Sequence, residues 1–262
     1  VSFLQSIGYQ WMRPEDNEDA RDGLNNVILR DVFLDTICKI NHIPRESAQA
    51  VYQELLSIHD NDRWTSILRG AYSRPLPNES KHTTIWLIDY MTPKNNVLTV
   101  TNQFTVEAEK TRRPDLVVFV NGIPLVVIEA KSPVSSKDKA GEAFDQIMQY
   151  EQQIPRLFYS NLFNLITNGE SLMYGATGSP SEYWAEWKDP HPKTQADFQN
   201  KLELGLWSLL EPARLLNILA HFVVFEKDET NGRLIKKVFR YQQYRRSEER
   251  RVVKECRSRW SQ

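Results

Sequence analysis

Two uninterrupted apolar runs, residues 116–120 and 123–128, flank the dipeptide Asn121-Gly122. Asn-Gly between two β-type runs favours a type I′ turn, because both central residues of that turn have positive φ. The two runs therefore predict an antiparallel hairpin. Because neither run alternates with polar residues, we expect both strands to lie in the middle of a sheet that is covered on both faces.

The remaining chain is expected to combine helices with strands. Apolar residues that recur at three- and four-residue steps predict helices over residues 19–41, 44–58, 62–71 and 137–153. β-Branched and aromatic residues predict strands over residues 84–88, 97–106 and 163–167, the first two joined by a turn. This order of elements predicts an α/β fold with a central sheet between layers of helices.

The C-terminal third begins with a stretch rich in glycine and proline, residues 175–200, which we interpret as a loop or a domain boundary. A helical region is expected over residues 194–219. Two further β-type runs, residues 222–225 and 234–239, flank Asn231-Gly232 and predict a second hairpin.

The composition is that of a globular protein in a reducing compartment. Of the 262 residues, 40% are hydrophobic and 26% are charged, and the two cysteines, Cys38 and Cys256, form no C-x-x-C motif. No apolar run approaches the roughly 18 residues of a membrane span, and no secretory signal is visible. These features exclude a disulfide scaffold and a membrane protein, and we expect a soluble cytoplasmic protein.

The net charge of -1 conceals a basic C-terminal segment. From Arg233 to Gln262 there are eleven Lys or Arg and three Glu, a local net charge of +8. Such a segment is either a solvated surface or a contact for nucleic acid or an acidic partner. The sequence leaves both interpretations open.

Three polar residues lie at the open end of the first predicted hairpin. Asp115 precedes its first strand, and Glu129 and Lys131 end its second strand on one face. The chain reversal brings these ends together, so the three side chains can meet. Two carboxylates from adjacent strands suit Mg²⁺, which polarises a phosphoryl oxygen, and an ammonium group offsets the charge that develops there. The alternative is an ordinary charged strand end.

Two amides and a phenol accompany this group. Gln146 and Tyr150 are four residues apart and project from one face of the predicted helix, and Gln103 lies on the strand before the hairpin. They are either packing and capping residues or groups that support an active site and hold DNA backbone. The five histidines have no H-x-x-x-H or H-E-x-x-H spacing, which argues against a zinc site.

Residues 113–131, Arg-Pro-Asp-Leu-Val-Val-Phe-Val-Asn-Gly-Ile-Pro-Leu-Val-Val-Ile-Glu-Ala-Lys, closely resemble the N-terminal nuclease region of the R (restriction) subunit of type I restriction-modification enzymes. The resemblance spans essentially all 262 residues. Further matching segments are Ile88-Asp89-Tyr90, Thr101-Asn102-Gln103-Phe104, Thr167-Asn168-Gly169 and Tyr241-Gln242-Gln243-Tyr244.

This resemblance implies a restriction-endonuclease-like core of the PD-(D/E)xK type, in which helices flank a central mixed sheet. It implies that Asp115, Glu129 and Lys131 are catalytic residues. The implied Mg²⁺-binding positions are Asp115, Glu129 and Ala130.

Two further parts of the family pattern are present. Gln146 and Tyr150 match a Q-x-x-x-Y element that a subset of these nucleases carries. Gln243 matches a glutamine that contacts adenine at the entrance of an ATP-dependent motor. The resemblance therefore implies that ATP serves only the full-length protein.

The resemblance also implies a domain organisation. Residues 1–175 would be the nuclease domain, residues 176–230 a linker and helical connector, and residues 231–262 the start of the motor, an extension toward a helicase-like lobe. The chain ends before a Walker A lysine, and it begins after a Glu that the family carries upstream of the segment at residues 4–9. We therefore expect an N-terminal fragment of a longer subunit.

The function implied is Mg²⁺-dependent hydrolysis of DNA phosphodiester bonds, coupled in the full protein to ATP-driven translocation. The implied partners are double-stranded DNA and the M (methyltransferase) and S (specificity) subunits of the same system, without a membrane. Two alternatives stay open. One is a free-standing nuclease that acts on DNA structures or ends, and the other is a subunit-docking module without catalytic activity.

Overall fold

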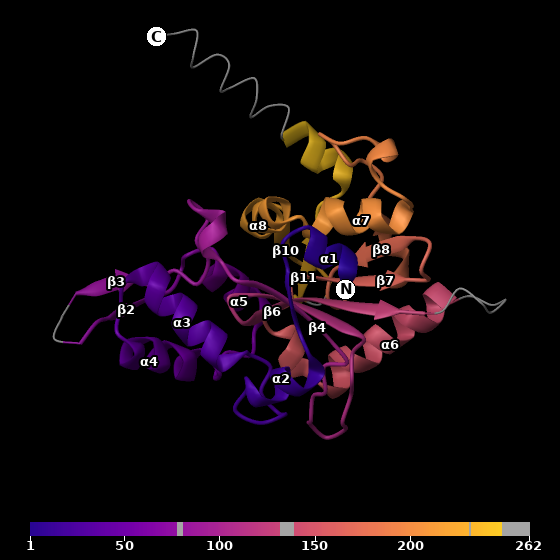
Figure 1. Ribbon diagram of the computed structural model, residues 1–262. Coiled ribbons are helices and arrows are strands. Elements are labelled where there is room, and N and C mark those ends of the chain that lie inside the picture. Colours follow the sequence, from indigo (N-terminus) through magenta and orange to yellow (C-terminus); the bar gives the residue numbers. More distant parts are fainter. Residues whose placement is uncertain (78–80, 132–138, 231, 248–262) are drawn as a thin grey trace, which may run out of the picture.

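A mixed β-sheet lies at the centre of the molecule (Figure 1). The structure is a computed structural model that describes residues 1–77, 81–131, 139–230 and 232–247. In this part of the chain the sheet has seven strands, β1 (Gln10–Met12), β4 (Leu98–Asn102), β5 (Leu116–Val120), β6 (Ile123–Ala130), β7 (Phe163–Thr167), β8 (Leu172–Gly175) and β9 (Ala185–Glu186). They are adjacent in that order; β1 is parallel to β4, β6 is parallel to β7, and the other neighbours are antiparallel.

The hairpin predicted around Asn121-Gly122 is confirmed, and β5 and β6 form it. Asn121 has a φ of 54° and Gly122 a φ of 77°, both positive as a type I′ turn requires. The Asn121 side chain is fully buried. Its Oδ1 accepts a hydrogen bond from Val97 N at 2.8 Å, and its Nδ2 donates to Leu87 O at 2.7 Å. The turn is therefore anchored inside the protein rather than exposed.

Gly122 lies directly against the start of helix α3 (Arg30–Asn41). A Cβ atom at this glycine would lie 2.5 Å from Leu29 O and 2.9 Å from Phe33 N. Leu29 N also donates a hydrogen bond to Gly122 O at 2.8 Å. The contact between turn and helix thus needs a residue without a side chain.

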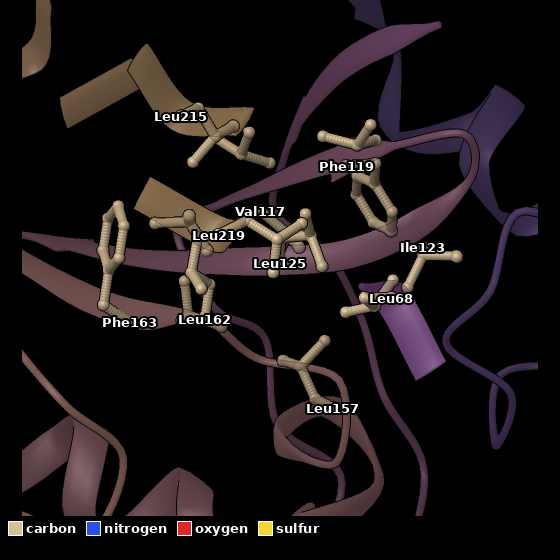
Figure 2. Packing of buried hydrophobic residues seen from close by; sticks show 14 of the residues in the cluster. Leu68, Val117, Phe119, Ile123, Leu125, Leu157, Leu162, Phe163, Leu215 and Leu219 are labelled. Carbon is tan, nitrogen blue, oxygen red and sulfur yellow. The ribbon is translucent and has the colours of Figure 1, made fainter. Parts of the chain in front are cut away.

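Helices cover both faces of the sheet (Figure 1). Helix α6 (Lys139–Gln153) lies on one face and connects β6 to β7, whereas α1 (Ser2–Ser6), α7 (Lys201–Leu210) and α8 (Pro212–His221) lie over the other. Figure 2 shows Leu215 and Leu219 of α8 beside Val117 and Leu125 of the hairpin. This arrangement confirms the predicted α/β class and is consistent with a restriction-endonuclease-like core.

The other elements lie mostly toward the hairpin turn. Helices α3, α4 (Arg45–Leu55) and α5 (Asn61–Leu68) group together there, and α2 (Pro14–Asp19) packs near β4. Short 3₁₀ helices cover Pro93–Asn95, Pro155–Phe158, Ser181–Tyr183 and Gln195–Asp197. Two-stranded sheets are formed by β2 (Ser73–Pro75) with β3 (His82–Thr84) and by β10 (Val223–Lys227) with β11 (Leu234–Val238).

The helix predicted over residues 19–41 is wrong in its first half. Residues 20–29 form bends and turns between α2 and α3. Gly23 has a φ of 84°, and the buried Arg21 guanidinium donates to Asn26 O at 3.1 Å and to Thr105 O at 2.9 Å. A loop folded around one arginine therefore replaces nearly three helical turns.

The strand predicted over residues 84–88 is also wrong, apart from Thr84 at the end of β3. Residues 85–88 run as an irregular segment in which Ile85, Leu87 and Ile88 are buried and Trp86 is exposed. Side chains from other parts of the chain bond to its backbone. Trp86 N donates to Asn41 Oδ1 at 2.7 Å, and Leu87 O accepts from Asn121. The next predicted strand ends early, at Asn102, because Gln103 has a φ of 54°. No turn joins the two into a hairpin, since β3 pairs with β2 and β4 with β1 and β5.

Other predictions are closer. Strand β7 matches residues 163–167, and α4, α5 and α6 lie within or near their predicted ranges, although residues 137–138 are outside the described residues. The helical region over residues 194–219 contains two helices, because Pro212 starts α8 immediately after Glu211 caps it. The second hairpin is confirmed by β10 and β11, while Asn231 in its turn is outside the described residues.

Strand β11 buries a charged residue and exposes apolar ones. The Lys236 side chain is only 6% exposed, whereas Leu234 and Ile235 are 55% and 41% exposed. Lys236 Nζ donates to Asn161 O, and burial lowers the pKa of this lysine to about 7, opposed by the nearby Glu151 carboxylate. Glu151, on α6, accepts from Gly178 N at 2.9 Å, and burial raises its pKa to about 7. These contacts attach the C-terminal hairpin to α6 and β7.

The domain division at residues 175 and 230 remains a prediction. Strand β9 continues the central sheet beyond residue 175, and α7 contacts β8. Within the described ranges, no helix combines the length and the apolar character needed to cross a membrane.

Candidate active site

Asp115 immediately precedes β5, at the open end of the β5–β6 hairpin. Its Oδ2 accepts a hydrogen bond from Ala130 N at 2.9 Å, across the open end of the hairpin. Gln103 holds it from the other side, because Gln103 N donates to Asp115 O at 2.8 Å and its side-chain amide reaches Asp115 Oδ1 at 3.4 Å. The left-handed backbone of Gln103, which ends β4, thus places an amide beside the carboxylate.

Glu129 and Lys131 lie at the C-terminal end of β6, also at the open end of the hairpin, and their side chains are on one face. Lys131 Nζ donates to Glu129 Oε1 at 2.9 Å. Glu129 is only 1% exposed, and its second oxygen, Oε2, is buried without a hydrogen-bond partner. Burial raises the pKa of Glu129 to about 6; Asp115 adds to this shift and Lys131 opposes it.

Helix α6 supplies the third side of the cluster. Gln146 Oε1 accepts a hydrogen bond from Lys131 Nζ, and Gln146 Nε2 donates to the Tyr150 hydroxyl. Tyr150 is buried, and burial is the main reason why its pKa is raised to about 12. The hydroxyl is therefore protonated at neutral pH. A continuous chain of hydrogen bonds thus runs from Tyr150 through Gln146 and Lys131 to Glu129.

The donor atoms fit a divalent cation with oxygen ligands. A buried carboxylate oxygen without a partner is costly, and a bound cation would satisfy Glu129 Oε2. Asp115 supplies a second carboxylate from the adjacent strand, and Ala130 lies between Glu129 and Lys131. Within the described residues, no three His, Cys, Asp or Glu side chains are grouped to hold a metal ion. A cation here would therefore have two carboxylates and complete its shell with other oxygens.

Two grooves meet at the open end of the hairpin. One, of about 480 Å³, lies on the side of α6 and is lined by Arg113, Gln146 and Tyr150. The other, of about 600 Å³, lies on the side of α1 and is lined by Trp11 and Ala130. Gln103 and Asp115 line both grooves. An extended ligand that crosses this end of the hairpin would thus pass over the Asp115 carboxylate.

The structure brings together six of the residues singled out in the sequence. These are Gln103, Asp115, Glu129, Lys131, Gln146 and Tyr150. Gln243 belongs to a separate region, where its Oε1 accepts from Arg240 N at 2.8 Å at the start of the C-terminal helical segment. Its role in nucleotide binding stays a prediction.

The sequence reasoning did not find two residues of this region. Trp11 Nε1 donates to Asn102 Oδ1 at 2.9 Å, and both residues line the groove beside Asp115. Asn102 lies within the Thr101–Phe104 segment that the resemblance includes, but Trp11 has no such signal. Only the parallel pairing of β1 with β4 brings it to the site.

The sequence matches the family described as "Type I restriction enzyme R protein N terminus" over residues 1–183. It is 28% identical over 260 residues to the type I restriction enzyme HindI endonuclease subunit of Haemophilus influenzae, covering 92% of this chain and 24% of that protein. It is 34% identical over 158 residues to a Methanocaldococcus jannaschii protein with the provisional name type I restriction enzyme MjaVIIIP endonuclease subunit, covering 60% of this chain and 15% of that protein. The chain thus spans a quarter or less of the length of these relatives.

Proposed function

The chain belongs to the family of type I restriction enzyme R protein N termini, and from this premise we propose that it is a Mg²⁺-dependent endonuclease domain that hydrolyses DNA phosphodiester bonds. The observation that carries the proposal is the cluster at the open end of the β5–β6 hairpin. There Asp115 and Glu129 lie beside Lys131, and Glu129 Oε2 has no partner. Double-stranded DNA would be the substrate.

In this proposal, Asp115 and Glu129 hold the cation. The chemistry that a bound Mg²⁺ supplies is Lewis-acid polarisation of a phosphoryl oxygen. Gln103 and Ala130 N fix the orientation of the Asp115 carboxylate through their hydrogen bonds. Glu129 must be ionised to bind a cation, which its raised pKa permits at neutral pH.

Lys131 acts on the reacting phosphate. Hydrolysis forms a bond from a water oxygen to phosphorus and breaks the bond from phosphorus to the leaving oxygen. The leaving oxygen takes the electron pair of that bond and one proton of the water, and negative charge grows on the non-bridging oxygens in the transition state. The Lys131 ammonium group offsets this charge. Gln146, itself held by the Tyr150 hydroxyl, restricts the position of Nζ, so the ammonium group is ordered before DNA binds.

We further propose that this activity belongs to a larger assembly in the cytoplasm. The relatives are named as endonuclease subunits of type I restriction enzymes and are about four times longer or more. The M and S subunits of the same system would be its partners, and ATP-driven translocation by the rest of the R protein would control cleavage. Base recognition would lie outside this chain, because contacts to phosphate position DNA without reading it.

Calorimetric titration with Mg²⁺ and Mn²⁺ tests the metal site. We expect binding by the unchanged chain and its loss in Asp115→Ala. Asp145→Ala is a matched control, because Asp145 is an exposed carboxylate on α6 and outside the hydrogen-bonded cluster. Equal binding by the unchanged chain and Asp115→Ala would refute the metal site. Absence of binding by either would favour the docking module.

Plasmid cleavage tests the reaction. Lys131→Ala should abolish cutting by the assembled enzyme while leaving the circular dichroism spectrum unchanged. Cutting at the unchanged rate would refute the role of Lys131. Cleavage by the isolated chain, without M, S or ATP, would favour the free-standing nuclease, whereas metal binding without cleavage would favour a domain that depends on its assembly.

A further inference from the structure

Trp11 presents a large aromatic surface to solvent close to the candidate active site. Its side chain is 44% exposed, although most large apolar side chains in the described residues are buried. Trp11 lies on β1, the edge strand of the sheet, opposite Val100 of β4. Such exposure costs hydrophobic free energy, so a ligand that covers the indole would recover it.

A hydrogen bond orients the indole. Trp11 Nε1 donates to Asn102 Oδ1 at 2.9 Å, and Asn102 lies opposite Leu116 at the end of β4. The next residue, Gln103, is hydrogen-bonded to Asp115. Two neighbouring contacts therefore connect the indole to the carboxylate, and a preorganised ring loses little entropy when a ligand stacks on it.

The two grooves at the open end of the hairpin differ in their side chains. The groove on the α6 side is lined by Arg112 and Arg113 as well as by Asp115 and Glu142. The groove on the α1 side is lined by Ser2, Gln5, Trp11 and Asn102, and by no Lys or Arg side chain. The arginines of the first groove can contact phosphate, whereas the indole in the second offers its face to an uncharged planar group.

We infer that Trp11 stacks on an unpaired base of the DNA strand that passes over Asp115. This inference rests on the proposed nuclease function and extends it by assigning a preference for DNA that is locally single-stranded at the site of cutting. A paired base already covers both of its faces with its neighbours in the duplex, so one indole can stack only on a base that has left the helix.

The size of the effect follows from known stacking energies. Removing an aromatic platform costs about 1–3 kcal/mol per base, which corresponds to a roughly 5- to 150-fold loss of affinity. The loss should appear only with DNA that offers an unpaired base. Continuous duplex should bind equally well with or without the indole.

Fluorescence anisotropy with two otherwise identical DNAs tests the inference. One is a continuous duplex, and the other has a short single-stranded gap that contains 2-aminopurine. All proteins carry Lys131→Ala, so that DNA is not cut in Mg²⁺. Trp11→Ala and Trp11→Leu should lose about 5- to 150-fold in affinity for the gapped DNA. Trp11→Phe, which keeps an aromatic face, should restore most of the affinity and the quenching of 2-aminopurine.

Trp86→Ala is the matched control, because Trp86 is also 44% exposed and lines a different cavity. It should bind both DNAs like its parent. Trp11→Leu keeps apolar bulk on β1, so it serves if Trp11→Ala does not fold. Unchanged affinity for gapped DNA in both variants, or an equal loss on both DNAs, would overturn the inference while leaving the nuclease proposal intact. Failure of the parent to bind either DNA would count against both.

Discussion

Replacing Gly122 by alanine should destabilise the protein more than the same change at Gly178, another glycine with a positive φ. Two costs add at this position. The first is backbone strain, because Gly122 has a φ of 77° and an L-residue in the left-handed region loses about 1–2 kcal/mol. The second is steric, because the new Cβ would lie 2.5 Å from Leu29 O and 2.9 Å from Phe33 N. Both neighbours are backbone atoms at the start of α3 and cannot rotate away.

Gly178 separates the two costs. Its φ of 76° is nearly the same, but a Cβ there would meet no atom within 4 Å. Gly178→Ala should therefore cost about 1–2 kcal/mol from strain alone. The steric clash of the new Cβ adds about 1–3 kcal/mol at Gly122. Gly122→Ala should therefore cost about 2–5 kcal/mol in total. The gain from a less flexible unfolded chain is common to both variants and cancels in the comparison.

Urea unfolding, followed by circular dichroism, measures the difference. The midpoint should fall in both variants with an unchanged slope, and further in Gly122→Ala. If the two variants lose the same free energy of unfolding, the contact between the turn and α3 does not require glycine, and the argument from close approach is wrong. If the slope changes, the two-state comparison fails and hydrogen exchange at residues 116–130 must replace it.

Two further changes test the surroundings of the site. Tyr150→Phe removes the hydroxyl that accepts a hydrogen bond from Gln146. The rate of DNA cleavage should fall about tenfold, the equivalent of one hydrogen bond, while the affinity for Mn²⁺ in calorimetry stays within about twofold. Cleavage at the full rate would show that the Tyr150 hydroxyl does not contribute to catalysis. Glu151 has a pKa raised to about 7 from 4.5, so the folded state holds a proton that the unfolded state releases, and stability falls as pH rises from 4.5 toward 7 by on the order of 3 kcal/mol. Glu151→Gln should flatten this decline, because the variant has no carboxyl group that takes up a proton at this position. An unchanged slope of urea-derived stability against pH in Glu151→Gln would contradict this assignment.

The hairpin and the cluster at its open end could be predicted because their signals are local. Asn121-Gly122 determines the reversal, and the strand period then places Glu129 and Lys131 on one face beside Asp115. The helical spacing of Gln146 and Tyr150 likewise predicts a shared face. Each of these arguments needs only residues that are close in sequence.

Features that depend on distant residues could not be predicted in this way. Residues 85–88 have the composition of a strand, but the side chains of Asn41 and Asn121, from other parts of the chain, bond to the backbone of Trp86 and Leu87. The buried Lys236 contradicts the usual rule that lysines face solvent, because its partner carbonyl, Asn161 O, comes from the region before β7. Tertiary contacts decided the outcome in both cases.

The strand order affects how the site can be exchanged between related genes. Strands β4, β5 and β6 are neighbours in space in the same order as in the sequence, and α6 returns beside them, so the six clustered side chains lie in one uninterrupted stretch from Gln103 to Tyr150. This stretch is less than a fifth of the 262 residues. Recombination between related genes could therefore transfer the whole cluster in a single exchange. Trp11, which is encoded upstream, would remain with the recipient, so a hybrid gene would combine one parent's cluster with the other parent's tryptophan.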